Sequence, residues 1–109
     1  MPDAVIVHTM DDVRAALRNS SSPVTLQSAP DAVFYAGASY LLAMFRQAKA
    51  EFPDTEAIFI LDCADASAQA ISAMQMGHTH IRSRAAEPTL TKLHDVASQL
   101  GVAIISDNP

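Results

Sequence analysis

Residues 57–65 read Ala57-Ile58-Phe59-Ile60-Leu61-Asp62-Cys63-Ala64-Asp65. Five consecutive apolar residues end abruptly in two acids that flank the only cysteine of the chain. An apolar run without alternation is typical of a parallel strand that is buried on both faces. In open α/β sheets ligands bind at the carboxyl ends of the strands. This stretch therefore predicts the centre of the fold and the edge at which a site would lie.

The composition limits the size of the fold and the kind of partner. Of the 109 residues, 50% are apolar and 17% are charged, against about 25% charged residues in soluble proteins. This length predicts a single α/β domain over residues 1–109, and the scarcity of charge indicates a surface that a partner covers in part. The formal net charge is −5 and the basic residues are scattered, so we expect no nucleic-acid partner.

The same features indicate the compartment. A lone cysteine cannot form an internal disulfide, which is natural in a reducing environment. The first residues lack the positive flank and long apolar run of a signal peptide. No segment approaches the ~20 apolar residues of a membrane span. We therefore expect a cytoplasmic protein that makes no contact with a membrane.

Apolar runs of strand length alternate with stretches of helical period. Thr9 followed by Asp12 predicts a helix start, and Gly77 and Gly101 predict two helix ends. Asp62 or Asp65 is expected to cap the helix that ends at Gly77. The expected strands are 4–7, 24–27, 57–61, 78–83 and 102–105, and the expected helices run from about 10 to 17, 37 to 52, 65 to 77 and 88 to 100.

This alternation predicts a five-stranded, mostly parallel sheet with right-handed crossovers. We expect a single three-layer domain with the flavodoxin-like strand order 2-1-3-4-5. The first helix would then lie on one face and the later helices on the other. No helical stretch follows the last expected strand before Pro109, so we expect the final helix that would join the first to be missing. The face that lacks a helix predicts a homodimer or a protein partner bound there.

Polar side chains gather where the expected strands end. We identify three candidate catalytic residues, Asp62, Cys63 and His8. The candidate ligand-binding residues are the acids, hydroxyls and glycine at the same edge: Asp11, Asp12, Asp65, Gly37, Ser39 and Ser83. Carboxylates at one rim could hold a hard cation, but each acid also precedes an expected helix and could simply cap it. We predict no metal site.

Cys63 allows two interpretations. A thiol between a strand end and a helix start can act as a nucleophile, with His8 on the neighbouring strand as its base. A buried free cysteine is more commonly a small core residue, and the phosphatase pattern Cys-x5-Arg is absent because Gln69 stands in the arginine position. We favour packing.

The connection 29–39 is long for so small a domain. Its small residues up to Ser39 could let an anion approach the helix start, or the segment could form a short capping helix with Val33 and Phe34 packed inward. It contains neither a GxGxxG fingerprint nor a Walker lysine, so no cofactor is expected. The alternating His78 and His80 resemble a metal pair, but they stand at the amino end of a strand without a third ligand. We expect structural or interface histidines.

The pair Asp11-Asp12 after the first strand, Asp62 closing the third and Ser83 closing the fourth resemble the pattern of response-regulator receiver domains. The resemblance implies phosphoryl transfer to Asp62, with magnesium held by the acidic pair. Asn108 stands before Pro109 where the family has a lysine, and phosphoryl transfer needs such a cation. The resemblance therefore implies a non-phosphorylated, pseudo-receiver version of that domain.

Residues 37–42, Gly-Ala-Ser-Tyr-Leu-Leu, are similar to the core helix of anti-sigma-antagonist (STAS) domains, although the Asp-Ser-x-Gly motif of that family is absent. The stretch from Asp62 to Asp65 is also similar to that of small uncharacterised bacterial proteins. Three functions stay open: a non-catalytic interaction or regulatory module, a small enzyme or ligand binder with a carboxylate and thiol site, and a STAS-like binding module. We favour the first, acting as a homodimer.

Overall fold

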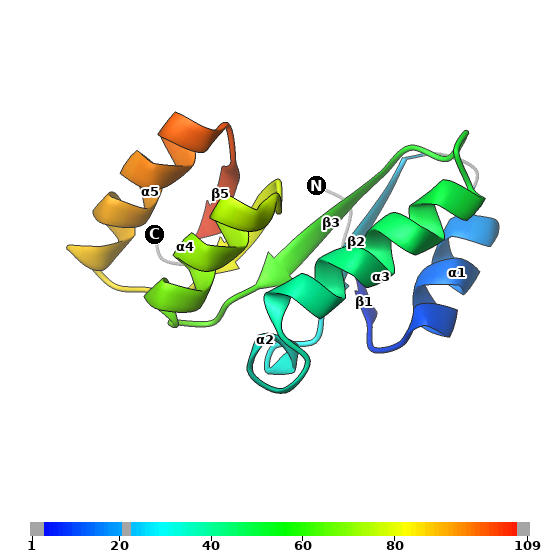
Figure 1. The fold of residues 1–109 in the computed structure, drawn as a ribbon, viewed down its shortest axis with the longest axis horizontal. Coiled ribbons are helices and arrows are strands. Elements are labelled where there is room, and N and C mark those ends of the chain that lie inside the picture. The colour runs from blue at the N-terminus through cyan, green and yellow to red at the C-terminus, as the bar shows by residue number, and fades with distance from the viewer. Residues whose placement is uncertain (1–3, 21–22, 107–109) are drawn as a thin grey trace.

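The computed structural model describes residues 4–20 and 23–106. Strands and helices alternate along the chain, as the sequence predicts (Figure 1). In chain order they are β1 (Val5–Val7), α1 (Met10–Arg18), β2 (Val24–Ser28), α2 (Ala32–Tyr35), α3 (Ala38–Glu51), β3 (Ala57–Asp62), α4 (Ser67–Met76), β4 (His80–Ser83), α5 (Thr89–Leu100) and β5 (Ala103–Ser106).

Local signals in the sequence set several of these boundaries. Thr9 and Asp12 form a capping box at the start of α1, in which each side chain accepts a hydrogen bond from the other residue's backbone amide. Gly77 ends α4 with a φ of 120°, and Gly101 ends α5 in the left-handed region. Residues with a Cβ rarely adopt such angles. The glycine positions predicted as helix ends are therefore confirmed.

All five strands are parallel, and their order is β1-β2-β3-β4-β5. The predicted order 2-1-3-4-5 is wrong. The sequence pattern identifies β3 as the central strand, and β3 is central in both orders, so the pattern could not distinguish them. In the observed order β2 lies between β1 and β3.

The predicted three layers are also wrong, because the strand order decides where the helices lie. Each connection moves one strand further in the same direction, so right-handed crossovers place every helix on the same face. In Figure 1 the helices lie together in front of the sheet, with α1 packed on α3, α3 on α4 and α4 on α5. The described residues therefore form two layers, a sheet and one layer of helices.

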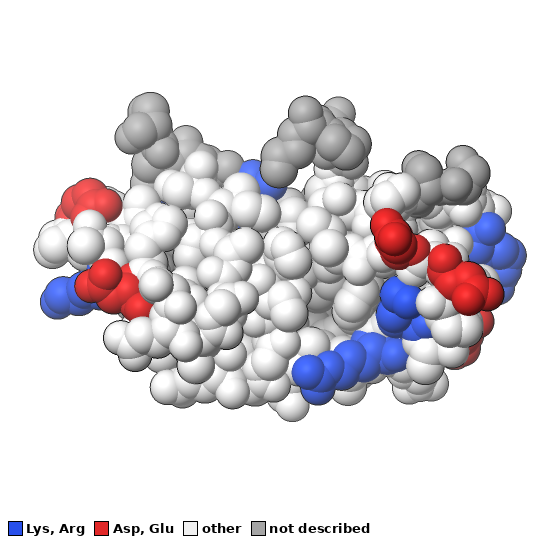
Figure 2. All heavy atoms as spheres, turned by 90° about the horizontal axis from the view of Figure 1, so that it is seen from above, with Lys and Arg blue, Asp and Glu red and all other residues white. Residues whose placement is uncertain are grey.

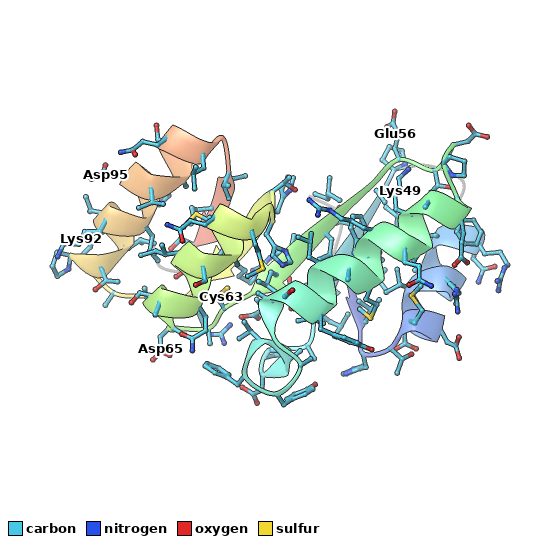
Figure 3. The ribbon with its side chains drawn as sticks, viewed as in Figure 1. Lys49, Glu56, Cys63, Asp65, Lys92 and Asp95 are labelled. Carbon is cyan, nitrogen blue, oxygen red and sulfur yellow. The ribbon has the colours of Figure 1, made fainter. Side chains whose placement is uncertain are left out.

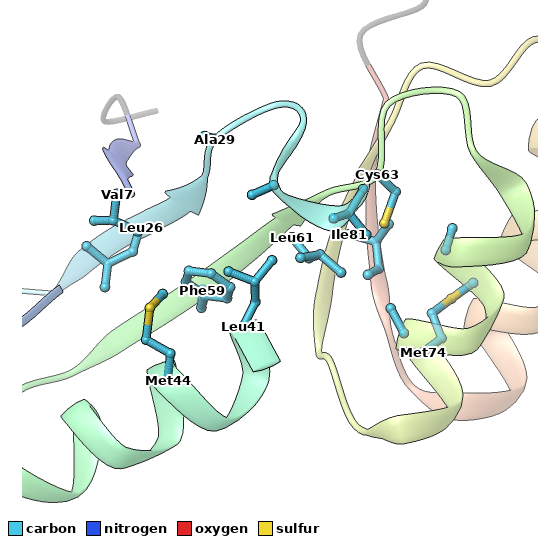
Figure 4. Close-up of a cluster of buried hydrophobic side chains, with 14 of the residues drawn as sticks. Val7, Leu26, Ala29, Leu41, Met44, Phe59, Leu61, Cys63, Met74 and Ile81 are labelled. Atoms are coloured by element: carbon cyan, nitrogen blue, oxygen red, sulfur yellow. The ribbon is translucent and has the colours of Figure 1, made fainter. Parts of the chain in front are cut away.

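The core fills the space between these two layers. Leu26, Phe59, Leu61 and Ile81 point from neighbouring strands toward the helices and are all less than 5% exposed. Figure 4 shows them meeting the helix side chains, among them Met44 of α3 and Met74 of α4. The ring of Phe59 also stacks on Phe45, with centroids 5.1 Å apart.

The opposite face of the sheet carries no helix of the described residues. Alternate strand residues point to it: Ile6, Thr25, Gln27, Ile58, Ile60, Asp62, His80, Arg82, Ala103 and Ile105. Ile6 is 44% exposed and Ile58 is 39% exposed, whereas Ile60 and Asp62 near the centre are buried. We call these ten residues the helix-free face.

Three smaller expectations concern the start of the fourth strand, the end of the chain and the membrane. The fourth strand begins at His80 rather than at His78. The residues after Ser106 lie outside the described part of the chain, and so does the expectation about a helix beyond the fifth strand. Among the described helices, none is both long and apolar enough to cross a membrane.

The two-layer core predicts a large cost for truncating Leu61, which is fully buried in the central strand. We expect Leu61→Ala to lower the free energy of unfolding by about 2–5 kcal/mol, because it removes buried methyl groups and leaves a cavity. Leu100→Ala, at an exposed position of α5, should change it by less than about 1 kcal/mol. Urea unfolding followed by circular dichroism measures both, and equal losses would contradict the position of the core.

Candidate functional site

The candidate site begins where β3 ends, at a buried aspartate. Asp62 is 1% exposed, and its backbone amide donates a hydrogen bond of 2.9 Å to Ser28 Oγ on β2. Its Oδ1 accepts a hydrogen bond of 2.9 Å from the amide of Ala64. Ala64 has a φ of 51°, a conformation that is uncommon for a residue with a Cβ. The Asp62 side chain therefore holds a tight turn immediately after the strand.

The other oxygen of Asp62 links three neighbouring segments of the sheet. Oδ2 lies 3.3 Å from Arg84 Nη1, in a salt bridge, and 3.4 Å from Gln27 Nε2. The amide of Arg84 also donates a hydrogen bond of 2.7 Å to Ala64 O. A buried carboxylate needs such partners, because an unpaired charge would be costly to bury.

Asp62 and Asp65 do not cap a helix, so that expectation is wrong. The helix α4 begins at Ser67, its N-cap residue is Ala66, and no side chain caps it. Asp65 is exposed in the preceding loop, and Figure 3 shows it at the edge of the molecule. The reason is tertiary: the carboxylate of Asp62 bonds to distant partners on β2 and after β4, which a local sequence pattern cannot reveal.

Cys63 lies in the core rather than at an open site. Its side chain is fully buried and lies close to Ile81 in Figure 4. Burial, with a smaller contribution from the charge of Asp62, raises the pKa of the thiol to about 12. A thiol with that pKa is protonated at neutral pH, and the thiolate is the nucleophilic form. The packing interpretation of Cys63 fits these surroundings.

His8 and the acidic pair lie apart from Cys63 and Asp62. Since β2 separates β1 from β3, two strand spacings of about 4.8 Å intervene between the ends of these strands. His8 is exposed, and together with Asp12 it lines a hollow of about 590 Å³ between α1 and the outer edge of β1. The structure therefore does not bring the proposed base to the proposed nucleophile.

The two carboxylates of α1 have different environments. Asp12 Oδ2 accepts hydrogen bonds from the amides of His8 (2.8 Å) and Thr9 (3.2 Å). The bond from His8 is the largest cause of a lowered pKa at Asp12. Asp11 is exposed and lies 3.8 Å from Arg14, which forms a second, bidentate pair with Glu51 of α3. Asp12 thus caps its helix, as the alternative interpretation predicts.

The remaining candidates lie elsewhere on the same rim. Ser83 is buried, and its Oγ accepts a hydrogen bond of 3.1 Å from the amide of Ala85. Gly37 is the N-cap of α3 with a φ of 86°, and Ser39 is exposed in the first turn. Both line a hollow of about 370 Å³ between α3 and α4.

His78, just before β4, and His80, the first residue of β4, both lie within hydrogen-bond distance of neighbouring groups. His78 is 2% exposed, and its Nε2 lies 2.8 Å from Ala38 O at the start of α3. His80 Nδ1 lies 2.7 Å from Thr79 Oγ1. Within residues 4–20 and 23–106, no group of three or more His, Cys, Asp or Glu side chains is arranged to hold a metal ion.

Sequence reasoning missed two features of this rim. It did not identify Gln27 and Arg84 as partners of Asp62, because that pairing depends on which strands are neighbours. It also placed Phe34 inward, whereas Phe34 is 54% exposed and only Val33 is buried. The sequence did contain a pattern that indicates an exposed aromatic surface, because Phe34, Tyr35 and Tyr40 stand close together in a connecting segment and the start of the next helix.

Comparison with known proteins adds no assignment. Neither the models of known protein families nor the curated proteins contain a match to this chain.

The environment of Cys63 predicts low reactivity. We expect iodoacetamide at about pH 7.5 to alkylate native Cys63 at least about a hundredfold more slowly than the urea-unfolded chain, because the native thiol is buried and protonated. Mass spectrometry of timed samples measures both rates. Rapid alkylation of the native protein would instead favour the carboxylate and thiol site.

His78 predicts a dependence of stability on pH. Burial is the largest cause that lowers its pKa below 6.5, and the charge of Arg46 adds to it, although the bond to Ala38 opposes the change. At a pH between the lowered pKa of the folded chain and about 6.5, the unfolded chain therefore binds a proton at His78 that the folded chain does not. The stability from neutral His78 is fully present above about pH 6.5 and is lost as the pH falls below that value.

We expect the urea midpoint to fall between about pH 7.5 and about pH 5.5 in the wild-type protein, and to fall less in His78→Gln. The exposed His94 of α5 provides the control, and His94→Gln should keep the wild-type dependence. If His78→Gln keeps the full dependence, another group is responsible.

Proposed function

We propose that this chain is a non-catalytic protein-interaction or regulatory module that acts as a homodimer through its helix-free face. The observation that carries the proposal is the one-sided sheet. Parallel sheets occur almost only where both faces are covered. Here all the described helices cover one face, and Ile6 and Ile58 stay exposed on the other.

The chemistry of the helix-free face suits a second copy of the chain. Only Asp62 and Arg82 among its ten residues carry a full charge, of opposite sign, and Asp62 is buried against Arg84. Seen from above, edge-on to the sheet rather than onto this face, the molecule carries its charged side chains mainly toward its two ends (Figure 2). Two such faces can approach without strong repulsion, which favours self-association.

The size of the molecule sets an upper limit on the area of a dimer interface at this face. The molecule measures 40 × 28 × 22 Å, and Figure 1 looks down the shortest axis onto the helix layer. An ellipse of 40 × 28 Å has an area of roughly 900 Å², which is the outline of the whole molecule and an upper limit for the helix-free face; each partner buries ~800 Å² in an interface of standard size. Because the exposed apolar side chains cover only part of this outline, we expect a dimer that dissociates at low micromolar concentration.

The site geometry supports this function over the small enzyme or ligand binder. Asp62 already binds Gln27 and Arg84, and the thiol of Cys63 is protonated in the core. The pseudo-receiver and STAS-like roles stay predictions. Both would be regulatory interaction modules, and neither requires a catalytic group at the strand ends.

Neighbouring residues of β1 provide a matched test. Ile6 (44% exposed) points to the helix-free face, whereas Val5 (45% exposed) points to the helix side. We expect size-exclusion chromatography with light scattering to give about twice the 11.6 kDa monomer mass at ~50 µM for the wild type. Ile6→Glu and Ile58→Glu should give monomers, because they place a charge in the interface, and Val5→Glu should stay dimeric.

A wild-type monomer at that concentration would refute the proposal. Dissociation by Val5→Glu to the same extent as by Ile6→Glu would indicate pairing along the edge of β1 instead. Circular dichroism of each variant confirms that a monomer is still folded.

A further inference from the structure

A second surface of the molecule exposes aromatic side chains. Phe34 and Tyr35 of α2 and Tyr40 of α3 are 54%, 72% and 60% exposed. The chain has six aromatic residues, four Phe and two Tyr, so half of them lie exposed within seven positions. Large exposed apolar groups gathered in one place mark interaction sites more often than singly scattered ones. We call these three residues the aromatic rim.

Val33 and Ser39, the chain neighbours of Phe34 and Tyr40, line a hollow that could receive an apolar side chain. The hollow of about 370 Å³ lies between α3 and α4, with Val33, Gly37 and Ala38 on one side and Ala68 and Met76 on the other. Its lining residues carry no charge, and Met76 is itself 38% exposed. The Gly37 position is open, since a Cβ there would meet no atom within 4 Å.

Two exposed acids lie on the same edge of the molecule as the aromatic rim. Asp31 is exposed and immediately precedes α2, where its carbonyl accepts a hydrogen bond from the amide of Phe34. Asp65 is exposed three residues before Ala68. Figure 3 shows Asp65 on the same edge of the molecule as α2. The nearby Arg84 is already paired with Asp62.

We infer that the aromatic rim and the adjoining hollow bind a protein segment that carries an arginine or lysine next to an apolar side chain. The apolar side chain would enter the hollow. The cation would lie over the face of an exposed ring, where cations are attracted, and close to Asp31 or Asp65. The charge decides the class of partner, because acids beside the rings would repel an acidic segment, a nucleic acid or an anionic lipid surface.

This surface is distinct from the helix-free face. The aromatic rim lies on α2 and α3, which belong to the helix side, and so do the residues that line the hollow. The inference therefore does not depend on the proposed homodimer. A monomeric chain could bind such a segment, and a dimer could bind two.

The composition supplies a specific probe of this surface. The chain has no Trp, and its two Tyr residues, Tyr35 and Tyr40, both belong to the aromatic rim. Tyrosine emission therefore reports on the aromatic rim alone. As a probe we would use a synthetic pentapeptide of alternating arginine and leucine, with a pentapeptide of alternating glutamate and leucine as its control. We expect a saturable change of emission with the arginine peptide and none with the glutamate peptide.

Variants then locate the binding surface. Phe34→Ala and Asp65→Asn should each weaken the binding of the arginine peptide by about two- to fivefold, since each removes one exposed attraction. The matched controls lie on α5, where Leu100→Ala removes an exposed apolar side chain and Asp95→Asn removes an exposed carboxylate. Both controls should bind the peptide as the wild type does.

Three outcomes would overturn the inference: no saturable response to the arginine peptide up to about 1 mM, unchanged binding by Phe34→Ala, or an equal loss in the α5 controls. The last outcome would indicate general attraction to an acidic protein. Light scattering of Phe34→Ala should give the same mass as the wild type, so failure of this inference and failure of the homodimer are separate results.

Discussion

The handedness of the crossovers between parallel strands is the constraint on which the rest of this structure depends. A right-handed connection that moves one strand in a fixed direction places its helix on a fixed face of the sheet. Because each of the four connections leads to the next strand in the same direction across the sheet, all of their helices lie in a single layer. The position of the core, the helix-free face and the separation of the candidate site residues all follow from this repetition.

Much of the local structure could be predicted from the sequence. Thr9 and Asp12 interact with each other's backbone across three residues, so their pattern is readable without the fold. The same holds for Gly77 and Gly101, whose freedom at positive φ is a property of the residue itself. The helix 38–51 and the strand 57–62 also appear within one residue or so of the expected limits.

The arrangement of these elements could not be predicted, because it depends on contacts between residues far apart in the chain. The apolar run at Ile58 to Leu61 requires neighbours on both sides but does not say which strands they are. Because β2 rather than β1 lies next to β3, Gln27 meets Asp62, and the strand that leads to His8 is not adjacent to the strand that leads to Cys63. Asp62 therefore holds β2, β3 and the segment after β4 together rather than capping a helix. The acids that the sequence places at one rim are separated, with Asp11 and Asp12 on α1 and Asp65 in the loop before α4.

The sequential strand order also gives the molecule the energetics of a short linear array. Each strand pairs only with the strands of the neighbouring units, as in repeat proteins, whose stability is close to a sum of unit and nearest-neighbour contributions. Paired strand residues such as Val5 and Leu26, or Leu26 and Phe59, are far apart in the sequence, and such non-local pairing in a parallel sheet slows folding. In such an array the terminal units have one neighbour instead of two, so β1 with α1 and α5 with β5 are the parts whose local opening costs the least free energy.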